Sequence, residues 1–350
     1  MYEKDDPRSS LATATATAAP PPDGGAAIAA AQYFDLHRLA SADGSTGASA
    51  DGSTGASADG STAPSAAGIA APGSSGPRSS ASGSSASGSS GPDARTVVVR
   101  AQNVVLAHTE ARDGDDLDNG TLDGELAVLV TAASPAFTVL TGDGATLVES
   151  PGLVVVPPGA SRLTVHGDGP LVRLAEAGEP EWRDRAVNAG AYAQDHPRVA
   201  LLERWPEPVG APGVRFYPLA AVPDDPARFG RIFRTRSFMV NFLPETAGPR
   251  DPQKLSPHTH DDFEQLSLAV QGQYVHHIRT PWLNDSTAWR DDEHVRLGSP
   301  SLAVIPPPTV HTSEASDPGV NQLIDIFSPP RRDFSQKPGW VLNADDYPMP

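Results

Sequence analysis

The sequence predicts an all-β protein built from two barrel-like units, and three observations support this prediction. Short runs rich in Val, Ile, Leu and Thr recur from about residue 95 onward, among them "TVVVR", "ELAVLV" and "GLVVV". Gly, Pro and Asp separate these runs at intervals of roughly ten residues, a spacing typical of antiparallel sandwiches and barrels. The pattern occurs twice, over residues 95–178 and 195–350, with a linker at 179–194 in an irregular, Pro-rich stretch.

The two units share a segment, which favours an internal duplication. The first contains "GLVVVPPGASR" (152–162) and the second contains "SLAVIPPPTVH" (301–311). In each segment a strand is followed by a turn that begins with two prolines. A polar side chain stands three positions after the third residue of that turn. That side chain is Arg162 in the first unit and His311 in the second.

Residues 1–94 consist mostly of Ala, Gly, Ser, Thr and Pro, and "ADGSTGAS" starts at Ala42 and again at Ala50. Such a repeat has no apolar face to bury, so it cannot offset the entropy lost on ordering and is predicted to be disordered. The exception is "QYFDLHRLA" (32–40), which carries aromatic and leucine side chains. We expect this segment either to dock on the folded body as a strand or short helix, or to be an isolated helical fragment.

Composition excludes several classes of protein. The 350 residues include no cysteine, which rules out a disulfide framework, a zinc finger and a cysteine nucleophile. The net charge of −17 argues against nucleic acid or an anionic membrane surface as a partner. No run approaches the roughly 20 apolar residues of a membrane span, and the N-terminus lacks the basic region of a secretory signal. These features predict a cytoplasmic protein.

The stretch "PHTHDDFE" (257–264) is the strongest candidate for a functional site. In a helix His258 and His260 would point about 200° apart, whereas in a strand residues i and i+2 face the same side. Glu264 has the same parity as His260, so an unbroken strand would place all three on one face. His311 follows the Pro-rich turn at the start of another strand and is the fourth candidate ligand.

Three imidazoles and a carboxylate suit Fe(II), Mn(II), Ni(II) or Zn(II), and a six-coordinate ion would keep open positions for water, substrate or O₂. We therefore predict one divalent transition metal as the cofactor, with Fe(II) favoured.

"HTHDDFEQLSLAVQG" resembles the first sequence motif of the cupin superfamily, in which His-x-His is followed by three or four residues, Glu, a strand and Gly. "GSPSLAVIPPPTVH" resembles the second motif, Gly, strand, Pro-x-Gly, two residues and His. The resemblance implies two cupin-type jelly-roll barrels with His258, His260, Glu264 and His311 as metal ligands. It also implies a homodimer.

Three departures from the cupin pattern stand out. The gap from Glu264 to Gly272 is one residue longer than usual, which a β-bulge would accommodate. Pro308 replaces the turn glycine. Arg162 stands where the first unit would have its metal histidine, which implies a metal-free barrel over 95–178 and one metal site in 195–350.

The strand "QYVHHIR" (273–279) presents two rows of side chains. If Tyr274 and His276 enter the barrel, they could bind substrate or act as acid and base; if the other row enters, Arg279 could hold a carboxylate. On a later strand Gln322 or Asp325, but not both, could reach the pocket, and we select Gln322 as a substrate-binding residue.

Three functions fit these residues. The favoured one is a non-haem Fe(II) oxygenase or dioxygenase acting on a small polar or anionic metabolite. The alternative is a redox-neutral isomerase, epimerase or lyase that uses Zn, Mn or Ni as a Lewis acid on a sugar-like or hydroxy-acid substrate. A non-enzymatic binding or regulatory module ranks third, because fold alone does not settle function.

Overall fold

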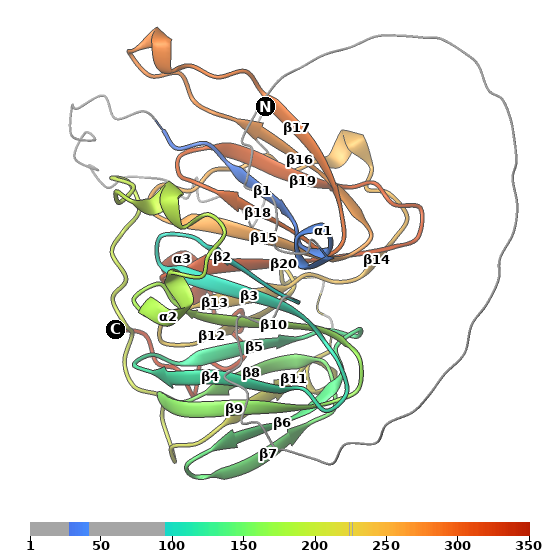
Figure 1. Ribbon diagram of the computed structural model, residues 1–350. Coiled ribbons are helices and arrows are strands. Elements are labelled where there is room, and N and C mark those ends of the chain that lie inside the picture. Colours follow the sequence, from blue (N-terminus) through green and yellow to red (C-terminus); the bar gives the residue numbers. More distant parts are fainter. Residues whose placement is uncertain (1–27, 42–94, 224, 226) are drawn as a thin grey trace, which may run out of the picture. The chain divides into compact units, whose positions relative to one another are not determined.

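The computed structural model describes residues 28–41, 95–223, 225 and 227–350, and it contains two β-barrels (Figure 1). Each barrel pairs one large sheet with one small sheet. The predicted all-β architecture of two cupin-type barrels is confirmed by this arrangement. Of the region predicted to be disordered, all but 28–41 lies outside the described residues.

The N-terminal barrel has a six-stranded sheet of order β11-β8-β5-β10-β3-β2 and a four-stranded sheet of order β4-β9-β6-β7. The strands of the large sheet span, in that order, Arg215–Pro218, Gly152–Val156, Leu126–Val130, Gly169–Glu176, Val104–Ala111 and Thr96–Arg100. Those of the small sheet span Asp116–Leu122, Gly159–His166, Ala136–Thr141 and Gly144–Val148.

The C-terminal barrel repeats this order. Its large sheet runs β1-β18-β15-β20-β13-β12, with β14 beside β20, and its small sheet runs β17-β16-β19. The strands of the large sheet span Gln32–Asp35, Ser301–Ile305, Glu264–Gln271, Val320–Ser328, Met239–Phe242 and Arg231–Arg234, and β14 spans Thr246–Ala247. Those of the small sheet span Glu293–Gly298, Gln273–Arg279 and Val310–Ala315. The matching order supports the duplication inferred from the shared segment.

Two edge strands cross the boundaries predicted from the sequence. The docking segment forms both β1 and the short helix α1 (Leu36–Ser41), and β1 pairs with β18 of the C-terminal barrel. Strand β11, which comes after the predicted boundary at residue 195, pairs with β8 of the N-terminal barrel. Each barrel is therefore completed by a segment distant from the rest of its strands in the sequence.

The two large sheets pack against each other and share one core. Alternate residues of their strands form a single cluster that includes Val99, Leu106 and Leu174 from one barrel and Val240, Leu266 and Ile324 from the other. Because one face of each strand lines its own barrel and the other faces this shared core, runs such as "SLAVI" are buried throughout.

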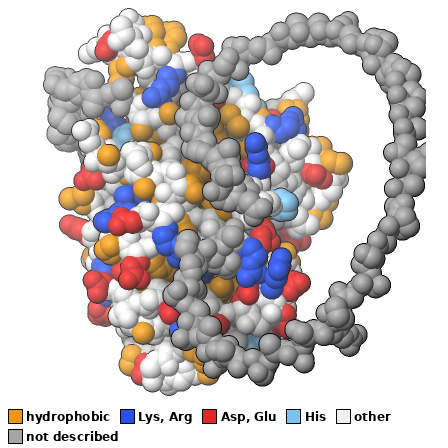
Figure 2. All heavy atoms as spheres, viewed as in Figure 1, with side chains coloured by type: hydrophobic (Ala, Val, Ile, Leu, Met, Phe, Trp, Pro, Cys, Tyr) orange, Lys and Arg blue, Asp and Glu red, His pale blue; other side chains and the backbone are white. Residues whose placement is uncertain are grey.

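The remaining helical turns connect the strands: α2 (Pro180–Arg183), η1 (Ala189–Tyr192), η2 (Leu219–Ala221), η3 (Pro252–Lys254), η4 (Ser286–Ala288) and α3 (Arg332–Ser335). None of the helices in the described residues is long and apolar enough to span a membrane. On the face shown in Figure 2, acidic and basic side chains are interspersed among the described residues, and the basic ones do not form a continuous surface.

Candidate metal centre

Three histidines converge inside the C-terminal barrel, as the sequence predicts. The segment before β15 pairs with the start of β19, because His258 N donates to His311 O (3.0 Å) and His311 N donates to His258 O (2.8 Å). One candidate ligand atom from each of His258, His260 and His311 lies within 4.8 Å of the others. All three side chains are buried, at 6%, 2% and 2% exposure.

Hydrogen bonds fix how two of these imidazoles are protonated. His258 Nδ1 lies 2.9 Å from Ser256 O, and His311 Nδ1 lies 3.0 Å from Thr309 O. A carbonyl oxygen only accepts, so each Nδ1 donates to its backbone partner, and His258 Nε2 keeps a lone pair for a metal. Ordered metal-ligating histidines are commonly held by a hydrogen bond of this kind.

The third imidazole, His260, lies in an apolar setting. Its ring stacks on Phe263 at a centroid distance of 4.5 Å and meets Phe327 edge-on. Burial lowers the pKa of His260 well below its usual value, and the nearby Arg331 guanidinium lowers it further. The ring is therefore neutral at physiological pH, the form that binds a metal.

The oxygen beside these histidines comes from Gln265. Its Oε1 lies 2.7 Å from His260 Nε2 and 3.1 Å from His311 Nε2. Its Nε2 donates to Ser267 Oγ (2.9 Å) and Asp325 Oδ1 (3.1 Å), so the amide oxygen is directed toward the imidazoles. A carboxylate at position 265 would have no N–H group to donate to Asp325, which accounts for a glutamine rather than a glutamate at this position.

Glu264, the predicted fourth ligand, does not join the histidines. Its carboxylate accepts hydrogen bonds from Gln102 N (2.6 Å) and Tyr192 Oη (2.8 Å), and burial raises its pKa. Gln102 belongs to the turn between β2 and β3, so Glu264 ties the start of β15 to the N-terminal barrel.

The parity argument failed because the chain from His260 to Glu264 is not an unbroken strand. Residues 261–263 form a bend, and β15 starts only at Glu264. The sequence did contain a signal. If Gln265 rather than Glu264 takes the place of the Glu in the motif, the gap to Gly272 has its usual length, without the extra residue that we assigned to a bulge. The β-bulge expected between Glu264 and Gly272 is nevertheless present, because the pairing of β15 with β20 shifts register between Ala269 and Gln271.

These residues fit a divalent transition metal. Three imidazole nitrogens are donors that Fe, Ni, Cu and Zn accept, and the amide carbonyl oxygen is a donor of the kind that suits Mn. His258, His260 and His311 would hold the ion, with Gln265 as the nearest oxygen.

A cavity of about 420 Å³ adjoins this cluster, and His258, Gln265 and His311 form part of its lining. Asp325 and Tyr274 also line it, but Gln322 does not. The choice of Gln322 is therefore corrected to Asp325, because along β20 the odd-numbered residues face the barrel interior.

The row of Tyr274, His276 and Ile278 faces the barrel interior, and all three are buried. His276 Nδ1 lies 2.9 Å from Ser313 Oγ, and burial lowers the pKa of His276 to about 4. His276 is not among the residues that line the cavity, whereas Tyr274 of the same row is.

Arg279 belongs to the outer row and does not reach the cavity. Its guanidinium pairs with Asp292 on the exterior and is 68% exposed. The predicted role of Arg279 in substrate binding is therefore not supported by its position.

Arg162 in the N-terminal barrel likewise faces outward. It pairs with Asp116 (2.6 Å) and Asp118 (3.1 Å) on the surface. The inward position on β9 is held by Ser161, one residue earlier. Arg162 therefore does not take the inward position that His311 has in the C-terminal barrel, and a metal-free N-terminal barrel stays a prediction.

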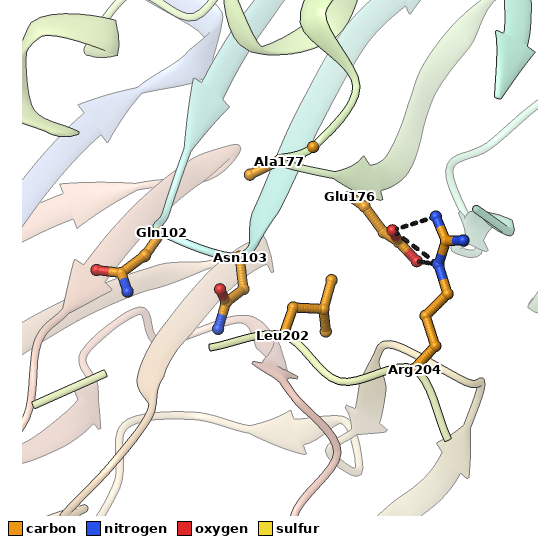
Figure 3. Close-up of a pocket in the computed structure, with 7 residues that line it drawn as sticks. Gln102, Asn103, Glu176, Ala177, Leu202 and Arg204 are labelled. Atoms are coloured by element: carbon orange, nitrogen blue, oxygen red, sulfur yellow. Dashed lines mark hydrogen bonds and ion pairs between the residues drawn. The ribbon is translucent and has the colours of Figure 1, made fainter. Parts of the chain in front are cut away.

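A second cavity, of about 460 Å³, is lined by the turn between β2 and β3, the end of β10 and the connector around Arg204 (Figure 3). Its charged groups are already paired: Arg204 makes a two-pronged contact with the Glu176 carboxylate, at 2.8 Å through Nε and 2.7 Å through Nη2. Ser237 Oγ also donates to Glu176. This cluster holds the connector before β11 against the end of β10. Its polar groups are already hydrogen-bonded to one another, so few of them are left to bind a ligand.

Comparison with known proteins gives a fold-level similarity. No protein-family model and no curated protein matches the chain. The similar solved structures include the formate complex of oxalate decarboxylase from Lactobacillus farciminis (12% identity, 66% of this chain and 78% of that chain, TM-score 0.45). They also include a Bacillus subtilis oxalate decarboxylase variant (11%, 66% and 71%, TM-score 0.44) and a structure of that enzyme from a study of its Mn(II) centres (10%, 68% and 74%, TM-score 0.42). At these identities and TM-scores the similarity carries no argument about metal, substrate or reaction.

Proposed function

We propose that the protein is a metal-dependent enzyme of the cupin type. His258, His260 and His311 hold one divalent transition metal, and a small-molecule substrate binds beside it in the adjoining cavity. The observation that carries this proposal is the convergence of three buried imidazoles within 4.8 Å, two of them with Nδ1 fixed to backbone carbonyls. The Nδ1 atom of His260 is buried and has no hydrogen-bond partner, which is the environment expected of a nitrogen that a metal would bind.

The reaction class we favour is that of a non-haem Fe(II) oxygenase. The donor set in the barrel is neutral and rich in nitrogen, which suits Fe(II) better than Mn(II). Bound iron would supply a centre that holds substrate and O₂ together. Phe263 and Phe327 exclude water from the His260 side of this centre.

Tyr274 and Asp325 are the residues placed to handle protons. Both line the cavity, and burial together with the Asp325 charge raises the pKa of Tyr274. Tyr274 therefore stays protonated and can donate a hydrogen bond to a substrate oxygen. Asp325 accepts from Gln265 and Ser267, which holds its carboxylate toward the same region.

A redox-neutral lyase or isomerase is the second candidate, and Asp325 is the observation that favours it. A carboxylate in the wall of a metal site can remove a proton from a substrate whose carbonyl the metal polarises. In that case Zn, Mn or Ni would serve, and turnover would continue without O₂.

The test is metal analysis of protein purified without a metal-chelating tag, combined with oxygen-electrode assays after reconstitution with each metal. We expect wild-type protein to bind one metal per chain and His260→Ala to lose both the metal and all turnover. The matched control is His277→Ala, which removes a histidine from the outer row of β16, away from the cluster. Retention of metal by His260→Ala, with an unchanged circular dichroism spectrum, would refute the site; turnover that persists anaerobically would select the lyase.

A further inference from the structure

The cavity beside the candidate metal centre has a polar inner end and an apolar body. His258, His311, Gln265 and Asp325 form the inner end. Most of the remaining wall is apolar, and its main contributors are Phe229, Leu243, Pro244, Ala247, Ala315 and Leu323. A ligand that fills this space must bury apolar surface as well as reach the metal.

The apolar wall is held in place by backbone hydrogen bonds. The segment after β13 is tied to the strands of the barrel: Leu243 N donates to Leu323 O (3.1 Å), and β14 pairs with the start of β20. Further along, Gly248 N donates to Gly319 O (2.7 Å) and Arg250 N donates to Ala315 O (2.9 Å). A wall fixed in this way needs little reordering when a ligand binds, so its apolar contacts contribute to affinity.

The size of the cavity also constrains the ligand. A volume of about 420 Å³ lies in the range of cavities that take ligands much larger than a two-carbon acid. Oxalate has no apolar surface, and it would leave the wall around Leu323 and Ala315 in contact with trapped water.

Charge sets the nature of the polar end. Three imidazoles and an amide are neutral, so a divalent ion keeps its full charge and favours an anionic oxygen donor. Asp325 is the single acidic residue among those that line the cavity. Arg250 is the basic residue with a permanent charge in the same lining, so charge favours an anionic ligand without limiting it to a single negative group.

We propose that the site takes an oxygen-chelating acid whose body is apolar and about the size of a phenyl ring, such as an aryl-substituted 2-oxo acid. This inference rests on the proposed metal site and names its substrate class. The chelating oxygens bind at the histidine end, the apolar body lies against Leu243, Ala247 and Leu323, and Tyr274 donates to the acid group or its neighbouring oxygen.

The experiment uses Co(II)-loaded protein, whose visible absorption reports ligands that bind to the metal. Phenylpyruvate, pyruvate and oxalate are titrated in turn, and the cobalt content is measured after gel filtration. We expect phenylpyruvate to bind at least about tenfold more tightly than pyruvate or oxalate, because only phenylpyruvate buries an apolar ring. Equal or tighter binding of pyruvate or oxalate would overturn the proposal.

Two variants sharpen this result. Ala247→Trp fills the apolar wall from an exposed strand, so it should fold normally and weaken phenylpyruvate binding about tenfold, with pyruvate changed by less than about twofold. Ala145→Trp, on an exposed position of β7 in the other barrel, is the control and should change neither. An unchanged phenylpyruvate affinity in Ala247→Trp counts against the proposal.

The outcomes separate the substrate class from the metal site. If wild-type protein binds cobalt and His260→Ala does not, the metal site stands, and the titrations alone decide the substrate class. If the wild-type protein fails to bind cobalt, the metal site and the inference fall together.

Discussion

The two barrels share one strand order, yet their interiors are filled in different ways. The N-terminal barrel is packed with Phe137, Val139, Leu163 and similar apolar side chains. A buried polar network runs from Arg173, whose guanidinium donates to Asn119 Oδ1 (2.8 Å) and Thr109 Oγ1 (3.1 Å). Asn119 in turn donates to Ser161 Oγ.

The corresponding place in the C-terminal barrel holds the three histidines and a cavity. Asn119 and Ser161 lie on β4 and β9, which are arranged like the His258 segment and β19. The N-terminal barrel thus holds the positively charged side chain of Arg173 in its interior. The C-terminal barrel instead holds neutral donors, which can bind a metal cation that exchanges with solvent. The comparison teaches that the same strand scaffold becomes a site only where its interior is left partly unfilled and supplied with ligands.

The largest effect that would test this comparison is expected from Arg173→Ala. The change leaves Asn119 and Thr109 without their donor and creates a cavity, so we expect a loss of about 4 kcal/mol in the free energy of unfolding. Urea denaturation measures it. Arg162→Ala is the control, since its ion pairs lie on the surface, where solvent screens them, and its stability should stay close to that of wild type. A loss of metal in Arg173→Ala protein that remains folded would contradict the division of roles between the barrels.

A pH effect of about 3 kcal/mol is expected from His108 in the N-terminal barrel. His108 is fully buried, and burial lowers its pKa from 6.5 to about 4. The folded pKa is below the unfolded one, so the unfolded state binds more protons between these values. Stability is full above about pH 6.5 and is lost as pH falls toward 4, at about 1.4 kcal/mol per unit.

The check is urea denaturation of metal-free protein at several values of pH, compared with His108→Leu. The variant should lose markedly less stability over this range than the wild type does. An identical pH profile would show that the acid sensitivity arises from the histidines of the other barrel.

Gln265→Ala should lower metal affinity ten- to hundredfold, the usual effect of removing a group that contacts and orients metal-binding imidazoles. This equals about 1.4–2.7 kcal/mol. Competition with a metal-binding dye measures it. Glu264→Ala is the matched variant one residue earlier, and its metal affinity should stay within about threefold of wild type. The reverse ranking would restore Glu264 as the ligand.

The smallest effect is expected from Glu264→Gln, at about 1–2 kcal/mol of unfolding free energy. The amide cannot accept from both Gln102 N and Tyr192 Oη as well as the carboxylate does. Thermal unfolding measures the loss, and metal content should be unchanged. Tyr192→Phe provides the second half of a double-mutant cycle, in which a coupling near zero would rule out this tie between the barrels.

The predicted homodimer and cytoplasmic location remain predictions. The fold class, the duplication and the three histidines could be predicted because they depend on local patterns: strand-length apolar runs, a repeated Pro-Pro turn, and two histidines at strand spacing. Residue types that converge across strands, such as His258 and His311, were placed correctly because each lies next to a recognisable turn or strand start.

Two choices could not be made in the same way: that between Glu264 and Gln265 as the group beside the histidines, and that between Gln322 and Asp325 as the group that lines the cavity. Successive residues of a strand point to opposite faces, so a shift of one residue in where a strand begins exchanges the two sets. The sequence by itself determined that an imidazole cluster lies in a second β-barrel. Only the tertiary structure decided which neighbouring side chain joins this cluster and which distant segments, β1 and β11, complete the two large sheets. The reason is that packing between segments far apart in the chain sets both the pairing partner of a strand and which of its alternate residues face the interior.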